Sequence, residues 1–255
     1  MWGPDTPIRV PDPKMKLAGK ERGVKEGRIW VYGRDDRPRA GQDPPAAAYW
    51  FSPDRKGAHP QKHLENFIGI LQAEAYAGFR KLYERGLDSE PRIREAACWA
   101  HLGRDFHDIW KSTDSAIARD ALEQIGKLYD IERAINGQPL ERRLAARQQR
   151  SRPRVLTFRT WCEQQLARIP GKGDLAKAMR YALGRWNSFT LFLDDPRVAI
   201  DNNAAEWAIG PIAIGRKSIL FAGADAGGEI LAYAMTVIET AKLSDLNPEA
   251  YLADS

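Results

Sequence analysis

A long run of helical periodicity in the middle of the chain most limits what this sequence can fold into. From about Ser112 to Trp186, apolar residues recur at three- and four-residue spacing with little interruption, most regularly over 116–135. The first third of the chain carries short aromatic and β-branched runs instead, which favour strands. Strands followed by a block of helices predict an α/β core that is interrupted by a helical insertion.

The expected elements can be placed by residue range. Strands are expected at 28–33, 46–52 and 68–73, with a further strand at 93–101 that leads into a helix at 102–111. Helices are expected at 59–69, 75–86, 116–135, 140–150, 155–169, 174–193 and 228–242. The predicted domains are 1–111 as the first part of the core, 112–193 as the insertion, 194–221 as the end of the core, and 222–255 as a short C-terminal helical segment.

Composition narrows the class of protein. Charged residues make up 29% of the chain and hydrophobic ones 43%, the balance of an ordinary globular protein. No apolar run approaches the length of a membrane span, and the N-terminus has no signal-peptide pattern. Cys98 and Cys162 are isolated, which argues against a disulfide framework and fits a reducing cytoplasm.

Positive charge is concentrated in two runs. The net charge is +5, and residues 13–28 and 141–154 are both rich in lysine or arginine. Such a run is usually a solvated face of a protein. Two runs in one chain shift the balance toward contacts with phosphate, as in a nucleic-acid-binding protein.

The segment "IDNNAAEWAIGPIAIGRKS" at 200–218 is the most informative motif. Asp201 is well placed to cap a helix, on which Asn202, Asn203 and Glu206 could share one face. Carboxylate and amide oxygens suit Mg²⁺ or Mn²⁺, and the nearby Arg216 and Lys217 suit phosphate. The alternative is a capped helix with an exposed glutamate and no ligand.

Other motifs are weaker. "GPIAIGRKS" approaches a phosphate-binding loop, but Arg216 intrudes before Lys217, and the motif does not lie between a strand and a helix. The glycine-rich run at 222–229 lacks dinucleotide-binding spacing and is more typical of a turn. His59 and His63 are four residues apart and could bind a metal, although capping and packing roles fit them better.

Several segments together resemble a known family. These are "GRIWVYGRDDRP", "YWFSPDRKGAHPQKHL", "GILQAEAYAGF", "EAACWAH", "DNNAAEWAIGPIAIGRKSILFAGADAGGE" and "IETAKLSDLNPEAYL". In this order, from about residue 5 to residue 253, they are similar to the transposases of bacterial insertion-sequence family 66. The similarity begins so near the first residue that we expect no DNA-end-recognition region ahead of it.

The resemblance implies a fold and a metal site. The implied fold is an RNase H-like core, a mixed sheet with flanking helices, interrupted by a helical insertion. Three acidic residues of DDE type would hold two divalent metals, Mg²⁺ or Mn²⁺, and the corresponding positions here are Asp5, Glu74 and Glu206. The implied reaction is two-metal strand cleavage and strand transfer on DNA.

The resemblance also implies partners and a location. DNA would be bound as the ends of an insertion sequence and as target, with Arg216, Lys217, Arg142, Arg143 and Arg147 as the expected phosphate contacts. A homo-oligomer and accessory proteins of the same element are further expected partners, in the bacterial cytoplasm at the nucleoid. Two other functions stay open: a DNA-binding remnant of a transposase without catalysis, and an RNase H-like nuclease that cuts without joining strands.

Overall fold

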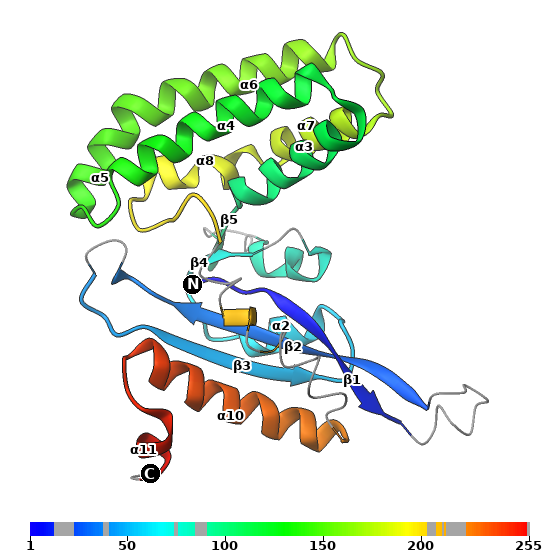
Figure 1. Ribbon diagram of the computed structural model, residues 1–255, viewed down its shortest axis with the longest axis vertical. Helices are drawn as coiled ribbons and strands as arrows, with labels where there is room; N and C mark the ends of the chain where they lie inside the picture. Colours follow the sequence, from blue (N-terminus) through cyan, green and yellow to red (C-terminus); the bar gives the residue numbers. More distant parts are fainter. Residues whose placement is uncertain are drawn as a thin grey trace. The chain divides into compact units, whose positions relative to one another are not determined.

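The computed structural model of the protein separates into two compact units, and each is described here by itself (Figure 1). The first unit comprises Met1–Asp35, Asp43–Arg94 and Asn203–Ser255, and the second comprises Asp36–Gln42 and Glu95–Asn202. The structure describes residues 1–12, 23–37, 41–73, 76–84, 91–202, 208–210, 212 and 223–253. No helix in these ranges is both long and apolar enough to cross a membrane.

An antiparallel sheet is the centre of the first unit. Its strands are β1 (Asp5–Pro11), β2 (Val24–Arg34) and β3 (Ala46–Ser52), hydrogen-bonded in that order. The register sets Asp5 opposite Trp30 and Trp30 opposite Trp50. Residues directly opposite in neighbouring strands project from the same face of a sheet, so these three side chains form one row across it.

The N-terminal residues connect this sheet to a smaller one. The second sheet contains β4 (Gly69–Gln72) and β5 (Ile93–Ala96). Trp2 bridges antiparallel to Gly33 and parallel to Gln72, and the amide of Gly3 donates to the carbonyl of Gln72 at 3.0 Å. A Cβ atom on Gly33 would lie 1.8 Å from the Trp2 ring, so only glycine permits this close approach.

Helix α10 (Asp225–Leu243) covers one face of the larger sheet and the free edge of β3 (Figure 1). The amides of Tyr49 and Ala47 donate to the hydroxyls of Thr236 and Thr240, at 2.9 and 3.2 Å. These bonds satisfy backbone groups that an edge strand would otherwise leave open to pairing with another chain. The apolar side chains of this face include Ile8, Val10, Ile29 and Val31.

The opposite face of the sheet packs against α2 (Ala58–His63) and the 3-10 helix η2 (Ala77–Tyr83). Trp30 is fully buried there, and its indole N–H donates to Ser52 Oγ at 2.7 Å. Leu71 of β4 and Phe79 of η2 belong to the same apolar cluster. The row of Asp5, Trp30 and Trp50 therefore lies on the face away from α10.

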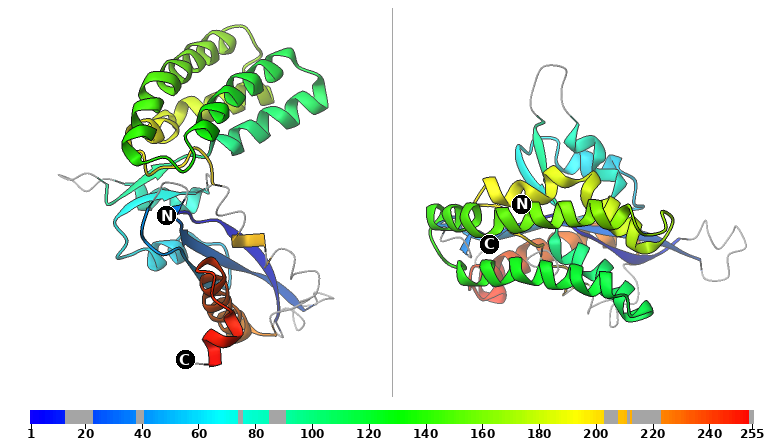
Figure 2. Two further views of the ribbon diagram at one scale, coloured as in Figure 1. Left: turned by 60° about the vertical axis from the view of Figure 1, so that its left-hand side comes forward. Right: turned by 90° about the horizontal axis from the view of Figure 1, so that it is seen from above.

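The second unit is helical (Figure 2). Its elements are α3 (Trp99–Thr113), α4 (Ala116–Ala134), α5 (Leu140–Ala146), the π-helical segment η3 (Arg147–Ser151), α6 (Arg152–Leu166), α7 (Asp174–Gly184) and α8 (Trp186–Asp194). Trp99 is fully buried, with Phe158, Phe189 and Phe192 around its ring. A last short helix, α11 (Pro248–Ala253), belongs to the first unit.

The predicted α/β class is confirmed, and several element boundaries differ from the predicted ones. The residue pattern alone did not indicate strand β1, because prolines at 4, 7 and 11 interrupt its alternation. The single helix predicted at 174–193 is two helices, separated at Arg185. The helical unit runs over Glu95–Asn202, whereas the sequence suggested an insertion at 112–193.

Candidate functional site

Of the three predicted acidic ligands, Asp5 is the one that lies within the described residues. It is the first residue of β1, and its side chain is 5% exposed. Arg55 donates to Asp5 Oδ1 from both Nη2, at 2.8 Å, and Nε, at 3.2 Å. Arg28 Nη1 lies 3.4 Å from Oδ2. The carboxylate is therefore buried and held between two guanidinium groups.

One oxygen of this carboxylate has no hydrogen bond. Asp5 Oδ2 is buried and accepts none from the described residues, while Oδ1 accepts two. Leaving a buried oxygen without a hydrogen bond has a free-energy cost, so such an atom calls for an explanation. A hard divalent cation is a suitable partner for it.

The surroundings of Asp5 are aromatic. The Arg55 guanidinium lies over the Tyr76 ring, 4.3 Å from its centroid, and the Tyr76 ring lies 5.8 Å from that of Trp30. Burial raises the pKa of the Tyr76 hydroxyl, and the Asp5 charge adds to that rise. Ala73, at the end of β4, is buried in the cluster that contains Trp30. Ala73 and Tyr76 thus both contact the cluster that contains Trp30.

The other predicted ligands lie outside the described residues. These are Glu74 and Glu206, together with Asn203 and the phosphate contacts Arg216 and Lys217. Asn202 is described: it is 5% exposed, and its Oδ1 is buried without a hydrogen bond. Ala208, the next described residue after Glu206, packs in the cluster on the α10 face and accepts a 2.6 Å hydrogen bond from the Tyr49 hydroxyl. That face is opposite to the one that carries Asp5.

No group of three or more histidine, cysteine or carboxylate side chains that could hold a metal occurs among the residues the structure describes. His59 and His63, the alternative pair, have other partners. His59 Nε2 lies 2.8 Å from Asp54 Oδ1, and His63 Nδ1 lies 3.1 Å from the Tyr32 hydroxyl. These contacts match the packing role expected for both histidines.

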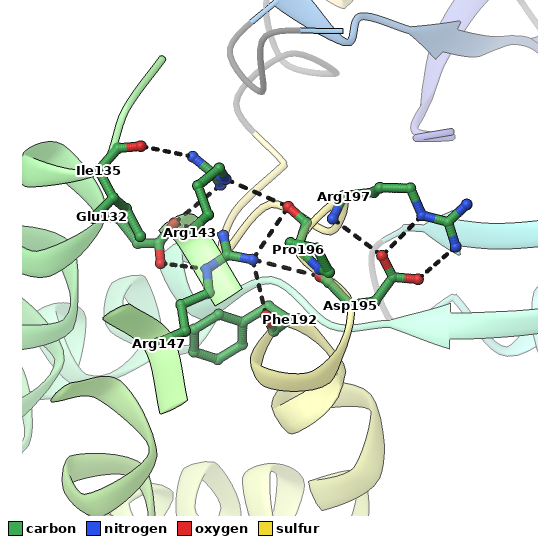
Figure 3. A network of polar contacts seen from close by, with 8 residues as sticks. All are labelled: Glu132, Ile135, Arg143, Arg147, Phe192, Asp195, Pro196 and Arg197. Carbon is green, nitrogen blue, oxygen red and sulfur yellow. Dashed lines mark hydrogen bonds and ion pairs between the residues drawn. The ribbon is translucent and has the colours of Figure 1, made fainter. Parts of the chain in front are cut away.

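Two of the predicted DNA-contacting arginines are inside the helical unit (Figure 3). Arg147 is fully buried; it pairs with Glu132 at 2.6 Å and donates to the Phe192 carbonyl at 2.8 Å. Arg143 is 4% exposed, pairs with the same glutamate and donates to the Ile135 carbonyl. Their guanidinium groups are thus taken up by internal partners, which corrects the prediction that they contact phosphate.

The third arginine of that run differs from the other two. Arg142 is exposed, and its Nη1 donates a hydrogen bond to Gln138 Oε1 at 3.5 Å. A side chain one residue from one buried arginine and five from the other can point outward because a helix turns about 100° per residue. Contact of Arg142 with phosphate stays a prediction.

His63 makes the stability of the first unit depend on pH. Burial, followed by the nearby charges of His59 and Lys62, lowers the pKa of His63 to about 4. Between its ordinary value near 6.5 and about 4, the unfolded chain takes up a proton that the folded chain does not, so the free energy of unfolding falls as pH falls. Because the ring is only partly buried, we expect a loss of about 1–2 kcal/mol.

Urea unfolding at pH 7, 6 and 5 measures this loss. His63→Gln should reduce the change in the free energy of unfolding between pH 7 and pH 5. His107→Gln, at a histidine whose side chain is 46% exposed, should leave that change as it is in the native chain. If the free energy of unfolding of His63→Gln depends on pH as strongly as that of the native chain, other groups cause the pH dependence.

Sequence reasoning did not anticipate Arg28, Arg55 and Tyr76 around Asp5. Arg55 is fifty positions from Asp5 and belongs to a turn that resembles any polar loop. The β1–β2 pairing could have suggested Arg28, which lies two residues from Trp30 on the same face. That inference requires a register, and the register requires knowing that β1 is a strand.

Together these features define a mixed α/β protein with a buried, arginine-bound carboxylate at the start of β1. The family described as "Transposase IS66 family" matches residues 4–230, so the chain belongs to that family. No solved structure matches the chain.

Relatives occur in Sinorhizobium fredii (strain NBRC 101917 / NGR234). The chain is 42% identical over 240 residues to the uncharacterized protein y4hP, a match that covers 89% of this chain and 43% of that protein. It is 37% identical over 230 residues to the uncharacterized protein y4qI, with 89% and 42% covered. The chain therefore spans less than half the length of these relatives.

Proposed function

We propose that the chain is the catalytic region of a DDE-type transposase, which cleaves and joins DNA strands for an insertion sequence. Membership of the transposase family supports the general activity. The observation that carries the catalytic part is Asp5, whose buried carboxylate has one oxygen without a hydrogen bond at the start of β1. A carboxylate oxygen in that state fits a Mg²⁺ or Mn²⁺ ligand.

The fold supports an RNase H-like core for this region. The antiparallel sheet β1–β2–β3 has helices on both faces, and the parallel bridge from Trp2 to Gln72 joins it to the smaller sheet. The helical unit interrupts this arrangement along the chain, between Arg94 and Asn203. Both features agree with the architecture that the family resemblance implies.

We propose Glu74 and Glu206 as the partners of Asp5. Gly3 is hydrogen-bonded to Gln72, Asp5 follows Gly3 by two residues, and Glu74 follows Gln72 by two residues along a parallel pairing. For Glu206 the support is the motif alone, since Ala208 packs on the opposite face.

The residues around Asp5 have separate tasks in this proposal. The chemistry that bound Mg²⁺ or Mn²⁺ would supply is activation of water or a DNA 3′-hydroxyl and stabilisation of the leaving oxygen. Arg28, 17% exposed, orients the carboxylate from inside the unit. Arg55, 42% exposed, is placed to exchange part of its contact with Asp5 for a DNA phosphate.

A DNA-binding remnant without catalysis is the second candidate. Its support is the pair of arginines that already neutralise Asp5. Homo-oligomers and accessory proteins stay predictions under either function.

Titration calorimetry with Mn²⁺ separates the two candidates. We expect saturable binding to the native chain, loss of that binding in Glu206→Ala, and no change in Glu65→Ala, which removes an exposed glutamate from the loop after α2. Binding that is absent, or unaffected by Glu206→Ala, would contradict the catalytic proposal and leave the remnant.

A further inference from the structure

Trp50 is an unusually exposed tryptophan in the row that contains Asp5. Its residue surface is 48% exposed, although its cross-strand neighbour Trp30 is fully buried. The residues two positions away on the same face, Ala48 and Ser52, are small, so they leave the edges of the indole uncovered. A single exposed apolar residue is ordinary on a protein surface, so its surroundings must decide whether it has a role.

One face of the Trp50 ring is covered by another aromatic ring. His63 of α2 stacks on it, with ring centroids 4.9 Å apart and an angle of 23° between the planes. The same imidazole is fixed by the Tyr32 hydroxyl and lies edge-on to Trp30. An aromatic ring that is already ordered loses little conformational entropy when another flat group stacks on it.

A continuous series of contacts joins this ring to Asp5. From Trp50 it passes through His63 and Trp30 to Tyr76, whose ring lies under the Arg55 guanidinium that binds Asp5. Because Asp5 and Trp50 are two strands apart in one row, their backbones are about 10 Å apart. A group stacked on Trp50 would therefore be close to the carboxylate.

Cations flank the residues of this series of contacts: Lys62 lies near His63, and Arg55 lies over the Tyr76 ring. Lys62 is exposed and directly precedes His63. Lys56 and Arg55 have side chains that are 79% and 42% exposed, although each is paired with an aspartate. A flat ring bordered by cations is complementary to a nucleotide, since a base stacks and its phosphate pairs.

We propose that Trp50, backed by His63 and bordered by Lys62 and Arg55, stacks on a base of unpaired DNA next to Asp5. This inference rests on the proposed function only in taking DNA as the ligand, and it deepens that function by naming an unpaired nucleotide beside the reacting strand. Every base has a π-face, so binding at Trp50 is independent of sequence. Duplex DNA, whose bases are already stacked, cannot use the ring.

Fluorescence anisotropy with a labelled single-stranded oligonucleotide, and with its duplex, tests the proposal. Both are measured in EDTA, so the result does not depend on a metal site. We expect Trp50→Leu to weaken binding of the single strand about 5- to 100-fold, Trp50→Phe to weaken it less than about threefold, and duplex binding to stay unchanged. Tyr233→Ala is the matched control, at an aromatic residue that is 74% exposed on α10.

Two outcomes would overturn the proposal. One is an unchanged affinity of Trp50→Leu for the single strand, and the other is an equal loss for single strand and duplex, which would indicate a general defect. If Trp50→Leu does not fold, Trp50→Phe still tests the proposal. The single strand should quench part of the tryptophan fluorescence of the native chain, and this quenching should be absent in Trp50→Phe. Glu206→Ala should bind the single strand normally, so failure of the catalytic proposal would be seen separately.

Discussion

Replacing Arg147 with alanine is expected to destabilise the helical unit by about 3–5 kcal/mol. Its guanidinium is fully buried and contacts Glu132 and the Phe192 carbonyl (Figure 3). Removing it leaves a nearly buried carboxylate paired only with Arg143, at 3.4 Å, and leaves carbonyls at the end of α8 without their donor. The loss of one partner from a buried ion pair is among the larger effects that single substitutions produce.

Urea unfolding of the chain, followed by circular dichroism at 222 nm, measures this change. Arg142→Ala is the matched control, because that neighbouring arginine is exposed and should change stability by less than about 0.5 kcal/mol. Similar stabilities for the two variants would mean that Arg147 does not hold the end of α8 to α4.

Replacing Asp5 with asparagine is expected to reduce metal-dependent DNA cleavage at least about 100-fold, if the proposed function is correct. Substitutions of residues that only orient metal ligands already cost up to about 100-fold, and a ligand should cost at least as much. Asparagine keeps the size and one oxygen of the side chain but loses the charge that divalent cations require. Cleavage of a supercoiled plasmid in Mn²⁺ is a suitable assay.

Asp54→Asn is the control for this second prediction. Asp54 is a nearby carboxylate whose partners are Lys56 and His59, and it is not among the predicted ligands. The hydrogen bond from Lys56, together with the one from His59, lowers the pKa of Asp54 to about 2, so it is charged at any pH used for the assay. Equal activity in Asp5→Asn and Asp54→Asn would show that Asp5 is not a ligand.

The arginine run at 141–154 shows where sequence reasoning reaches its limit. Charge and spacing correctly indicated a helix, but they could not show which arginines point inward. That depends on Glu132, fifteen positions before Arg147, and on carbonyls of Phe192 and Pro196 more than forty positions after it. The π-helical turn at Arg147–Ser151 also changes the direction of the side chains relative to a regular α-helix, and the residue pattern does not predict this turn.

Asp5 illustrates the same limit at the candidate site. The family resemblance named it as a ligand position, while its burial and its two arginine partners came only with the fold. Pairing of β1 with β2 brings Arg28 to it, and the turn after β3 brings Arg55. Neither contact is local, so no window of the sequence contains it.

The sequence by itself indicated the mixed α/β class, most of the strands and helices, and the family. Those properties follow from local periodicity and from extended motifs, and both are patterns among residues that are close together in the sequence. The tertiary structure alone decided the row of Asp5, Trp30 and Trp50, the burial of Arg143 and Arg147, and the stacking of His63 on Trp50. The reason is that strand register and the packing of distant helices depend on free energies summed over long-range contacts, and a local pattern does not carry them.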